Sequence, residues 1–554
     1  EVLKGAKEKE DGVVFVYEER VQEGAHYEIV AAEDIYKADG ITLAFRKGEC
    51  ADKIVTGKDG KAVSKMLYLG KYHVIETKAP QGLVRKKTPA ENTRTVTLSY
   101  RGENVREYVS EEVVFRNERP KADVKVWKKE SGSETGLQGA RFGLYAAELI
   151  LADGNVAAVK DQLLETAVSR RDGSCLFQAD IPCGYQYYVK EIQAPVNYYK
   201  QTEKGRYTFS WSYENDETAR YSFPGIKAEQ EAVFYNQEVK ADISLKKIDA
   251  QSGKSVPQQM ASLKGAVYGL YAREAVFSAD GLGTLRYAKG AEVARKETDE
   301  EGTLCFEKVP LGKYEIREIK ASEGYLADPK VYPVDCEYEG QEQAVVKRSV
   351  TSREKIRTQT VTCFKLTGDN KETDLEWMKN AGFSLFSVSE LEQGGYLKKG
   401  SSLLLQDSQL VQQVIDLYRD KDTLCYDKMK ELKTAQYYDE LGNAKRVAEQ
   451  FSDEKGIVTF RALPYGKYIL AETSVPAGKM AAAPKVITVT SDENDGEVEG
   501  DGKGIPMPDF AIWDQPEVSY LKIWKKDAAT GKVVTKPGAK YVIHDIEGAY
   551  FNWY

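Results

Sequence analysis

Lysine, glutamate and asparagine recur at fixed positions on strand-like segments of this 554-residue chain. Every second residue of a β-strand lies on one face, so a polar residue that follows two apolar ones at alternating positions shares the core side with them. Lysine ends such a face at Lys128, Lys247, Lys365 and Lys525. Glutamate ends a second one at Glu76, Glu191, Glu318 and Glu472. An amide or acid ends a third at Asn117, Asn236 and Asp514.

Burial of these three groups points to a reaction between them. An isolated buried charge costs several kcal/mol, so three inward polar groups need a common reason, and contact with one another is the simplest. Burial lowers the pKa of lysine and raises that of glutamate, which favours a free amine and a protonated acid. The amine can then attack the side-chain carbonyl carbon of asparagine or aspartate while glutamate transfers protons, and ammonia or water leaves. An ordinary salt bridge at a strand end is the alternative.

The polar groups belong to phrases that repeat along the chain. The lysine phrase reads VKVWKKESG in one copy and LKIWKKDAATG in another. GARFGLYA or GAVYGLYA follows it, and then a glutamate phrase such as YYVKEIQAP. The amide or acid lies eleven positions before the next lysine, from 117 to 128, 236 to 247 and 514 to 525. This constant spacing predicts one architecture for all copies.

Five copies account for the length of the chain, which is too great for a single core. We expect domains at 1–119, 120–239, 240–357 and 358–516 and a truncated fifth at 517–554. The joints between them are short, which favours an elongated rod. The last residues, EGAYFNWY, break off within a strand-like run, so we expect the chain to be a piece of a longer protein.

Within each copy, short Val-, Tyr-, Phe- and Ile-rich runs alternate with turn residues, which predicts an all-β sandwich. One segment departs from this pattern, an insertion near 390–450 of the fourth copy. Its apolar residues Leu410, Val411, Val414 and Ile415 have roughly helical spacing. The insertion is either a ligand-binding element or a helical lid that covers one edge of the sandwich.

The phrases GARFGLYA and KEIQAPVNY, in that order, resemble those of the Cna protein B-type, SpaA-like pilin domains of Gram-positive surface proteins. The resemblance covers nearly the whole chain except the insertion. It implies tandem prealbumin-like (Ig-like) β-sandwiches that form intramolecular isopeptide bonds. By this resemblance, Glu76, Glu191 and Glu472 would promote bonds between Lys7 and Asn117, Lys128 and Asn236, and Lys365 and Asp514.

Three copies fit the resemblance less well. In the first, Lys7 is chosen by the KEKEDG turn that it begins, and Lys9 is the second choice. In the third, Lys247 and Glu318 are present, but Ser352, Arg353 and Glu354 stand where asparagine is expected, so we expect no bond. In the fifth, Lys525 has no partners within the sequence.

Composition excludes several classes of function. A net charge of −8 without a basic stripe disfavours nucleic acid as a partner. Three histidines leave little room for zinc or Ser/His catalysis, so no metal and no cofactor are expected. Seven cysteines without a CxxC pair disfavour a disulfide framework. No apolar run approaches the ~18 residues of a membrane span.

The sequence and the resemblance together predict the stalk or backbone of a cell-wall-anchored surface adhesin or pilin, extracellular and on the cell surface. Its partners would be the sortase-linked cell wall or pilus subunits. The only chemistry expected is single-turnover self-modification, so the chain is not predicted to be an enzyme. One alternative is a module that binds a host protein (immunoglobulin or matrix) or a glycan. Another is an accessory or catalytic protein in which these sandwiches are spacers.

Overall fold

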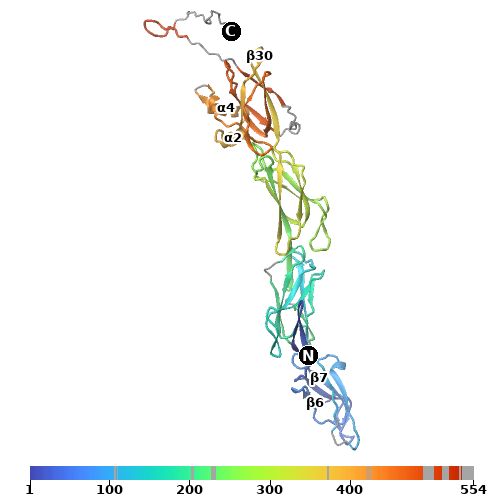
Figure 1. The fold of residues 1–554 in the computed structure, drawn as a ribbon. Helices are drawn as coiled ribbons and strands as arrows, with labels where there is room; N and C mark the ends of the chain where they lie inside the picture. Colours follow the sequence, from blue (N-terminus) through green and yellow to red (C-terminus); the bar gives the residue numbers. More distant parts are fainter. Residues whose placement is uncertain are drawn as a thin grey trace. The chain divides into compact units, whose positions relative to one another are not determined.

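The computed structural model describes residues 1–104, 108, 110–200, 205–225, 232–370, 374–420, 423–424, 426–490, 505–514, 523–535 and 538. Strands dominate and helices are few, which confirms the all-β class with a minor helical insertion (Figure 1). The chain divides into two compact units. The first comprises Glu1–Lys247, Lys264–Ala321 and Asp328–Ser352, and the second comprises Ile248–Leu263, Ser322–Ala327 and Arg353–Tyr554.

The first sandwich has one four-stranded sheet, with strand order β6-β3-β7-β8, and a short β4-β5 pair. Its elements are β3 (His26–Ala31), β4 (Ile35–Tyr36), β5 (Leu43–Phe45), β6 (Cys50–Val55), β7 (Gly70–Lys78), α1 (Pro89–Asn92) and β8 (Thr93–Leu98). Alternating Ile29, Ala31, Tyr72 and Val74 turn into its core. Two further segments, 61–69 and 110–117, pack Leu67, Val113 and Phe115 against this core but form no regular strand.

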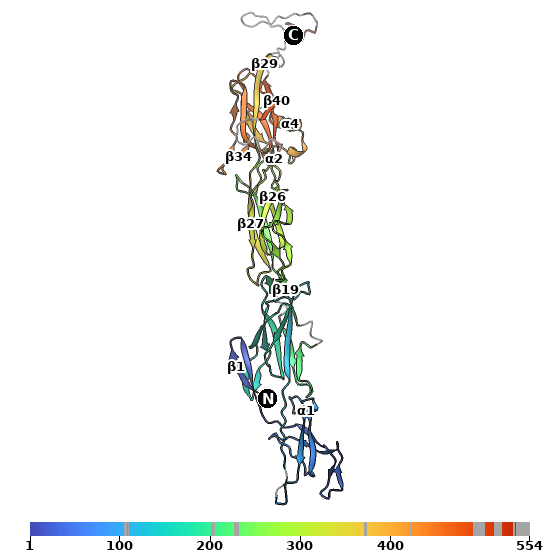
Figure 2. The same cartoon turned by 90° about the vertical axis from the view of Figure 1, so that its right-hand side faces the viewer.

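A hairpin of β1 (Val2–Lys9) and β2 (Gly12–Glu18) precedes the first sandwich but packs on the second (Figure 2). Val13 and Phe15 are buried in the same hydrophobic cluster as Phe142 and Leu164 of the second sandwich. Gly12 has a φ of 140°, and a Cβ there would lie 2.0 Å from the carbonyl oxygen of Leu164, so only glycine fits. The structure thus differs from the predicted first domain of 1–119, because the apolar face of residues 2–18 is buried elsewhere.

The second sandwich has the sheets β13-β10-β15-β17 and β14-β9-β19-β16, and β18 also pairs with β9. Its strands are β9 (Lys121–Glu130), β10 (Arg141–Ala146), β11 (Ile150–Ala152), β12 (Asn155–Ala158), β13 (Leu163–Val168), β14 (Ser174–Phe177), β15 (Tyr185–Gln193), β16 (Tyr198–Tyr199), β17 (Tyr207–Trp211), β18 (Arg220–Phe223) and β19 (Val233–Glu238). The first strand, β9, lies between antiparallel β14 and the parallel pieces β18 and β19. The opening and closing strands of the domain are therefore direct neighbours.

The third sandwich repeats this plan with the sheets β25-β20-β28 and β24-β21-β26-β27. Its strands are β20 (Lys240–Asp249), β21 (Val267–Ala272), β22 (Val276–Phe277), β23 (Leu285–Tyr287), β24 (Glu292–Glu297), β25 (Thr303–Pro310), β26 (Gly312–Lys320), β27 (Tyr332–Cys336) and β28 (Val345–Glu354). The opening strand β20 again has the closing strand β28 as its neighbour.

The fourth sandwich pairs β29 with β30, β37 and β40 in one sheet and orders the other as β36-β31-β38-β39. Its strands are β29 (Thr358–Asn370), β30 (Asp374–Trp377), β31 (Gly382–Ser387), β32 (Arg419–Asp420), β33 (Thr423–Leu424), β34 (Gln436–Tyr438), β35 (Ala444–Arg446), β36 (Gln450–Phe451), β37 (Ile457–Pro464), β38 (Gly466–Ser474), β39 (Lys485–Val489) and β40 (Ile505–Asp514). The closing strand β40 runs parallel to β29, as β19 does to β9.

The insertion contains the helices α2 (Val388–Gln393), α3 (Ser401–Leu404), α4 (Asp407–Tyr418) and α5 (Tyr426–Lys430). The Ser387 hydroxyl caps α2 by accepting a hydrogen bond from the Glu390 N–H. Leu410 and Val414 of α4 are buried against Ile469 of β38 and Val486 of β39. The alternate residues Leu470 of β38 and Ile487 of β39 belong to the domain core, so the helices cover the outer face of the sheet rather than its edge.

Little of the fifth copy is described. Lys525 is exposed, and an isolated bridge joins Lys526 to Val533. The rest of the predicted domain at 517–554 lies largely outside the described residues. Among the residues that are described, no helix is long and apolar enough to cross a membrane.

Candidate cross-linking sites

Strand register brings the lysine, glutamate and asparagine of the second sandwich to one end of its core. In the parallel pair, Lys128 of β9 lies opposite Phe234 of β19, and Asn236 follows on the same face. Glu191 of β15 comes from the opposite sheet, where it lies across from Phe142 of β10. Lys128 Nζ lies 3.2 Å from Glu191 Oε1, and Asn236 Nδ2 donates to the same oxygen at 2.9 Å.

This cluster is shielded from water. The Lys128 side chain is 0% exposed, and that of Glu191 is 7% exposed. The rings of Phe142 and Phe234 pack at 5.0 Å beside it. Burial lowers the pKa of Lys128 to about 8, although the nearby Glu191 opposes the shift. Burial also raises the pKa of Glu191, against the opposing influence of Lys128. Both shifts favour the neutral amine and the neutral acid.

The fourth sandwich repeats the geometry with aspartate in place of asparagine. Lys365 of β29 lies opposite Ile512 of β40, and Asp514 follows on the same face. Lys365 Nζ lies 3.0 Å from Glu472 Oε2 and also contacts Asp514 Oδ1. The three side chains are fully buried. Lys365 Nζ lies 5.5 Å from the ring centroid of Phe383, which faces Glu472 across the strand pair.

The buried position of Glu472 favours its protonated form. Desolvation raises its pKa to about 7, against the influence of Lys365 and of the Ala482 N–H, which donates to Oε2 at 3.0 Å. The negative charge of Asp514 acts in the same direction as burial. The fourth sandwich therefore holds an amine, a readily protonated acid and a carboxyl group in mutual contact.

The third sandwich keeps only part of the cluster. Lys247 Nζ lies 3.0 Å from Glu318 Oε1, and both side chains are buried. Ser352 Oγ accepts a hydrogen bond from the Tyr268 hydroxyl at 3.1 Å. Glu354 is also buried, whereas Arg353 is exposed. Neither the serine hydroxyl nor the Arg353 guanidinium offers a side-chain carbonyl carbon to an amine, but the buried Glu354 carboxyl does, so the absence of a bond in this sandwich stays a prediction.

The first sandwich brings Glu76 and Asn117 together, but not with Lys7. Asn117 Nδ2 donates to both carboxylate oxygens of Glu76, at 2.9 and 3.0 Å. Lys7 lies on β1, which pairs with β2 and packs on the second sandwich, and Lys9 lies at the end of the same strand. No described lysine or arginine forms an ion pair with Glu76. The choice between Lys7 and Lys9 therefore has no support in the structure.

One member of each cluster was not identified from the sequence. An aromatic residue faces the glutamate across the strand pair in each of the four sandwiches. These residues are Tyr27, Phe142, Tyr268 and Phe383. All four occupy the same position of the phrase that reads GARF in the second copy, which is the signal that could have revealed them. Directly opposite residues of an antiparallel pair have neighbouring side chains, so each ring lies beside its glutamate.

Comparison with known proteins defines the family. A profile described as "SpaA: Prealbumin-like fold domain" matches residues 20–103, 122–222, 241–350 and 409–503, which together make up more than half of the chain. The chain belongs to this family. The match confirms the resemblance found in the sequence.

Several solved structures match this chain at low identity and low TM-score. The TIE protein of Bacillus anthracis is 17% identical, with 93% of this chain and 73% of that chain covered and a TM-score of 0.40. GBS52, the minor pilin of Streptococcus agalactiae, is 14% identical, with coverages of 52% and 100% and a TM-score of 0.20. BcpA, the major pilin subunit of Bacillus cereus, is 17% identical, with coverages of 60% and 95% and a TM-score of 0.22. No curated protein sequence matches this chain.

Proposed function

We propose that this chain is the stalk or backbone of a cell-wall-anchored surface adhesin or pilin, stiffened by self-formed isopeptide bonds. The bonds join Lys128 to Asn236 and Lys365 to Asp514. One observation carries the proposal and recurs in two sandwiches. A buried lysine near the end of the opening strand contacts a buried glutamate, and the amide or acid of the closing strand lies in the same cluster. Membership of the SpaA prealbumin-like family supports it.

The reaction in the second sandwich needs no other reactant. The neutral Lys128 amine attacks Asn236 Cγ, while the protonated Glu191 donates a hydrogen bond to the amide oxygen. The C–N bond to lysine forms, the Cγ–Nδ2 bond breaks, and Glu191 passes the lysine proton to the departing ammonia. In the fourth sandwich the same steps join Lys365 to Asp514 and release water. Each site reacts once, so the chain is not an enzyme that turns over a substrate.

The position of each bond suits a protein under tension. In the second sandwich, β9 is the first strand and β19 the last, and only Val239 separates β19 from β20 of the next domain. A Lys128–Asn236 bond would carry force directly from the opening strand to the closing strand. The residues between them would then bear no load, and the sandwich could not be pulled open.

Single-molecule stretching of the whole chain tests the proposal. Each bond that is absent frees the residues between its two ends, about 110 in the second sandwich, which corresponds to roughly 370 Å of extended chain. We expect the unmodified chain to lack this extension for the second and fourth sandwiches, and Glu191→Gln and Glu472→Gln each to restore it for one. The third sandwich unfolds in all variants and serves as the internal reference. Full extension of the unmodified chain would refute the proposal.

A further inference from the structure

The half of the first sandwich that faces its four-stranded sheet has two segments, 61–69 and 110–117, and no described strand between them. In the third sandwich, β25 and β28 flank the opening strand β20. Residues 60–72 of the first sandwich read GKAVSKMLYLGKY and align without a gap with GTLCFEKVPLGKY at 302–314, so 61–68 correspond to β25. Residues 110–117 correspond to the closing strand. Neither segment forms a described strand.

The exposure of these segments fits an unfilled central strand. Inward positions of β25 are buried in the third sandwich, as at Leu304 and Phe306, whereas the aligned Ala62 and Ser64 are only half-buried. Apolar side chains are also exposed along both segments, among them Val63 at 89%, Met66 at 80% and Val114 at 71%. Strand-like backbone that belongs to no sheet, beside exposed apolar side chains, is a template for another strand.

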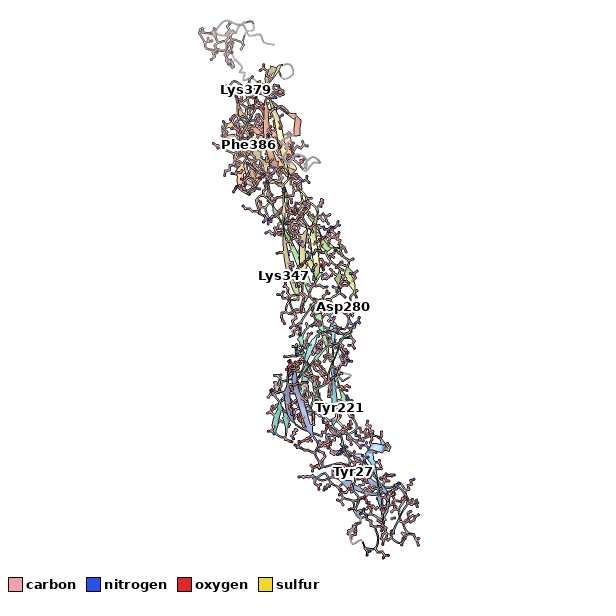
Figure 3. All side chains as sticks on the ribbon, turned by 45° about the vertical axis from the view of Figure 1, so that its right-hand side comes forward. Tyr27, Tyr221, Asp280, Lys347, Lys379 and Phe386 are labelled. Carbon is pink, nitrogen blue, oxygen red and sulfur yellow. The ribbon has the colours of Figure 1, made fainter. Side chains whose placement is uncertain are left out.

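The polar groups at one end of these two segments match those that surround the buried lysine of the second sandwich. Glu76 is 2% exposed and accepts two hydrogen bonds from Asn117, as Glu191 accepts one from Asn236. Burial raises the pKa of Glu76. Tyr27, labelled in Figure 3, faces Glu76 across the strand pair and packs on Phe115 at 4.7 Å. The acid, the amide and the aromatic cover of the second sandwich are thus all present in the first.

We propose that the first sandwich is an acceptor for a lysine-bearing strand of a second polypeptide, which it binds between 61–69 and 110–117 and joins covalently to Asn117. The strand carries two apolar residues and then a lysine at alternating positions, and it runs parallel to 110–117, as β9 does to β19. Residues 2–18 of this chain do not fill the position, because their apolar face packs on the second sandwich.

The joining step follows the reaction proposed for the second sandwich and rests on that proposed function. The incoming lysine amine attacks Asn117 Cγ, a new amide bond forms, and the Cγ–Nδ2 bond breaks. Glu76 transfers the lysine proton to the leaving ammonia. The product is an intermolecular isopeptide bond, which would link this chain covalently to the second polypeptide.

A synthetic peptide tests the inference on the whole chain. The probe has the sequence of residues 121–131, KADVKVWKKES, which forms the opening strand of the second sandwich. After incubation and denaturation, we expect an adduct whose mass is the sum of the two components less one ammonia, with the link mapped to Asn117. Glu76→Gln abolishes the adduct. The same peptide with Lys128→Arg gives none, because a guanidinium is not a nucleophile.

A second variant distinguishes loss of the reaction from loss of folding. Asn117→Asp keeps the acyl carbon, so its adduct forms with loss of water instead of ammonia, a change that misfolding cannot produce. Absence of an adduct, or reversible binding alone, overturns the inference. If the chain still shows the mass deficits of the second and fourth sandwiches, the proposed function survives that failure, and if it does not, both fail. A covalent dimer that forms without peptide and requires Lys525 overturns the assignment to a foreign strand in favour of a second copy.

Discussion

Replacing Glu191 by glutamine separates the chemistry of the second sandwich from its shape. Glutamine has nearly the same volume, but it cannot accept the proton of Lys128 or protonate the leaving ammonia. The carboxyl that it replaces lies 3.2 Å from Lys128 Nζ and accepts a hydrogen bond from Asn236. We therefore expect Glu191→Gln to fold without the bond and to retain the mass of one ammonia.

The size of the effect follows from the loop that the bond closes. The loop runs from residue 128 to residue 236, about 110 residues, for which the chain-entropy relation gives about 4.8 kcal/mol at 25 °C. The variant also leaves the buried Lys128 without its carboxylate, which acts in the same direction. A domain of this size loses about 4 °C of thermal midpoint per kcal/mol, so the thermal unfolding midpoint of the second sandwich should fall by roughly 20 °C.

Calorimetry of the whole chain measures this shift, and the transition of the fourth sandwich provides the internal reference. Asn236→Asp is the matched control, because it still forms the bond, with loss of water, and should keep the original midpoint. The reasoning fails if Glu191→Gln lacks the bond but melts with the unmodified chain. It also fails if the variant still forms the bond.

Three further predictions concern the described packing and charges. The Asn236→Ala variant cannot form the bond. Because folding lowers the pKa of Lys128, its free energy of unfolding should increase as the pH rises from about 8 towards the ordinary pKa of lysine. Urea unfolding measures this gain, which should vanish when Lys128→Met is added. Phe15→Ala should destabilise the second sandwich by about 3–5 kcal/mol, and an unchanged urea midpoint would contradict the hairpin's placement. Leu410→Ala should cost the fourth sandwich about 2–5 kcal/mol. Leu403→Ala, at an exposed site, should stay within about 0.5 kcal/mol, and equal effects would refute the packing of the insertion.

Strand alternation was sufficient to locate the clusters of the second and fourth sandwiches. The period of two fixes which residues share a face, so Lys128 and Asn236 could be assigned to the core before their partners were known. The same reasoning gave Lys365 and Asp514. In these cases the apolar residues on either side in the sequence are sufficient to assign each polar residue to the core face of its strand.

The position of the N-terminal hairpin could not be obtained in this way. Leu3, Ala6, Val13 and Phe15 define an apolar face, but a face carries no information about which neighbouring core will bury it. Sequence order predicted that the hairpin packs on the first sandwich. In the structure it packs on the cluster around Phe142 of the second sandwich. Lys7 was chosen by its KEKEDG turn, with the hairpin assigned to the first sandwich by sequence order. Likewise, helical spacing predicted α4 but not which side of the sheet it covers.

The central claim is that two sandwiches cross-link themselves, and the intact mass of the denatured chain tests it most directly. With no lysine paired to Asn117, we predict a deficit of one ammonia and one water, from the second and fourth sandwiches, rather than the two ammonias and one water that three bonds would release. Glu191→Gln should restore the ammonia alone, and Glu472→Gln the water alone. A mass equal to that of the unmodified sequence would contradict the account and leave both clusters as buried ion pairs.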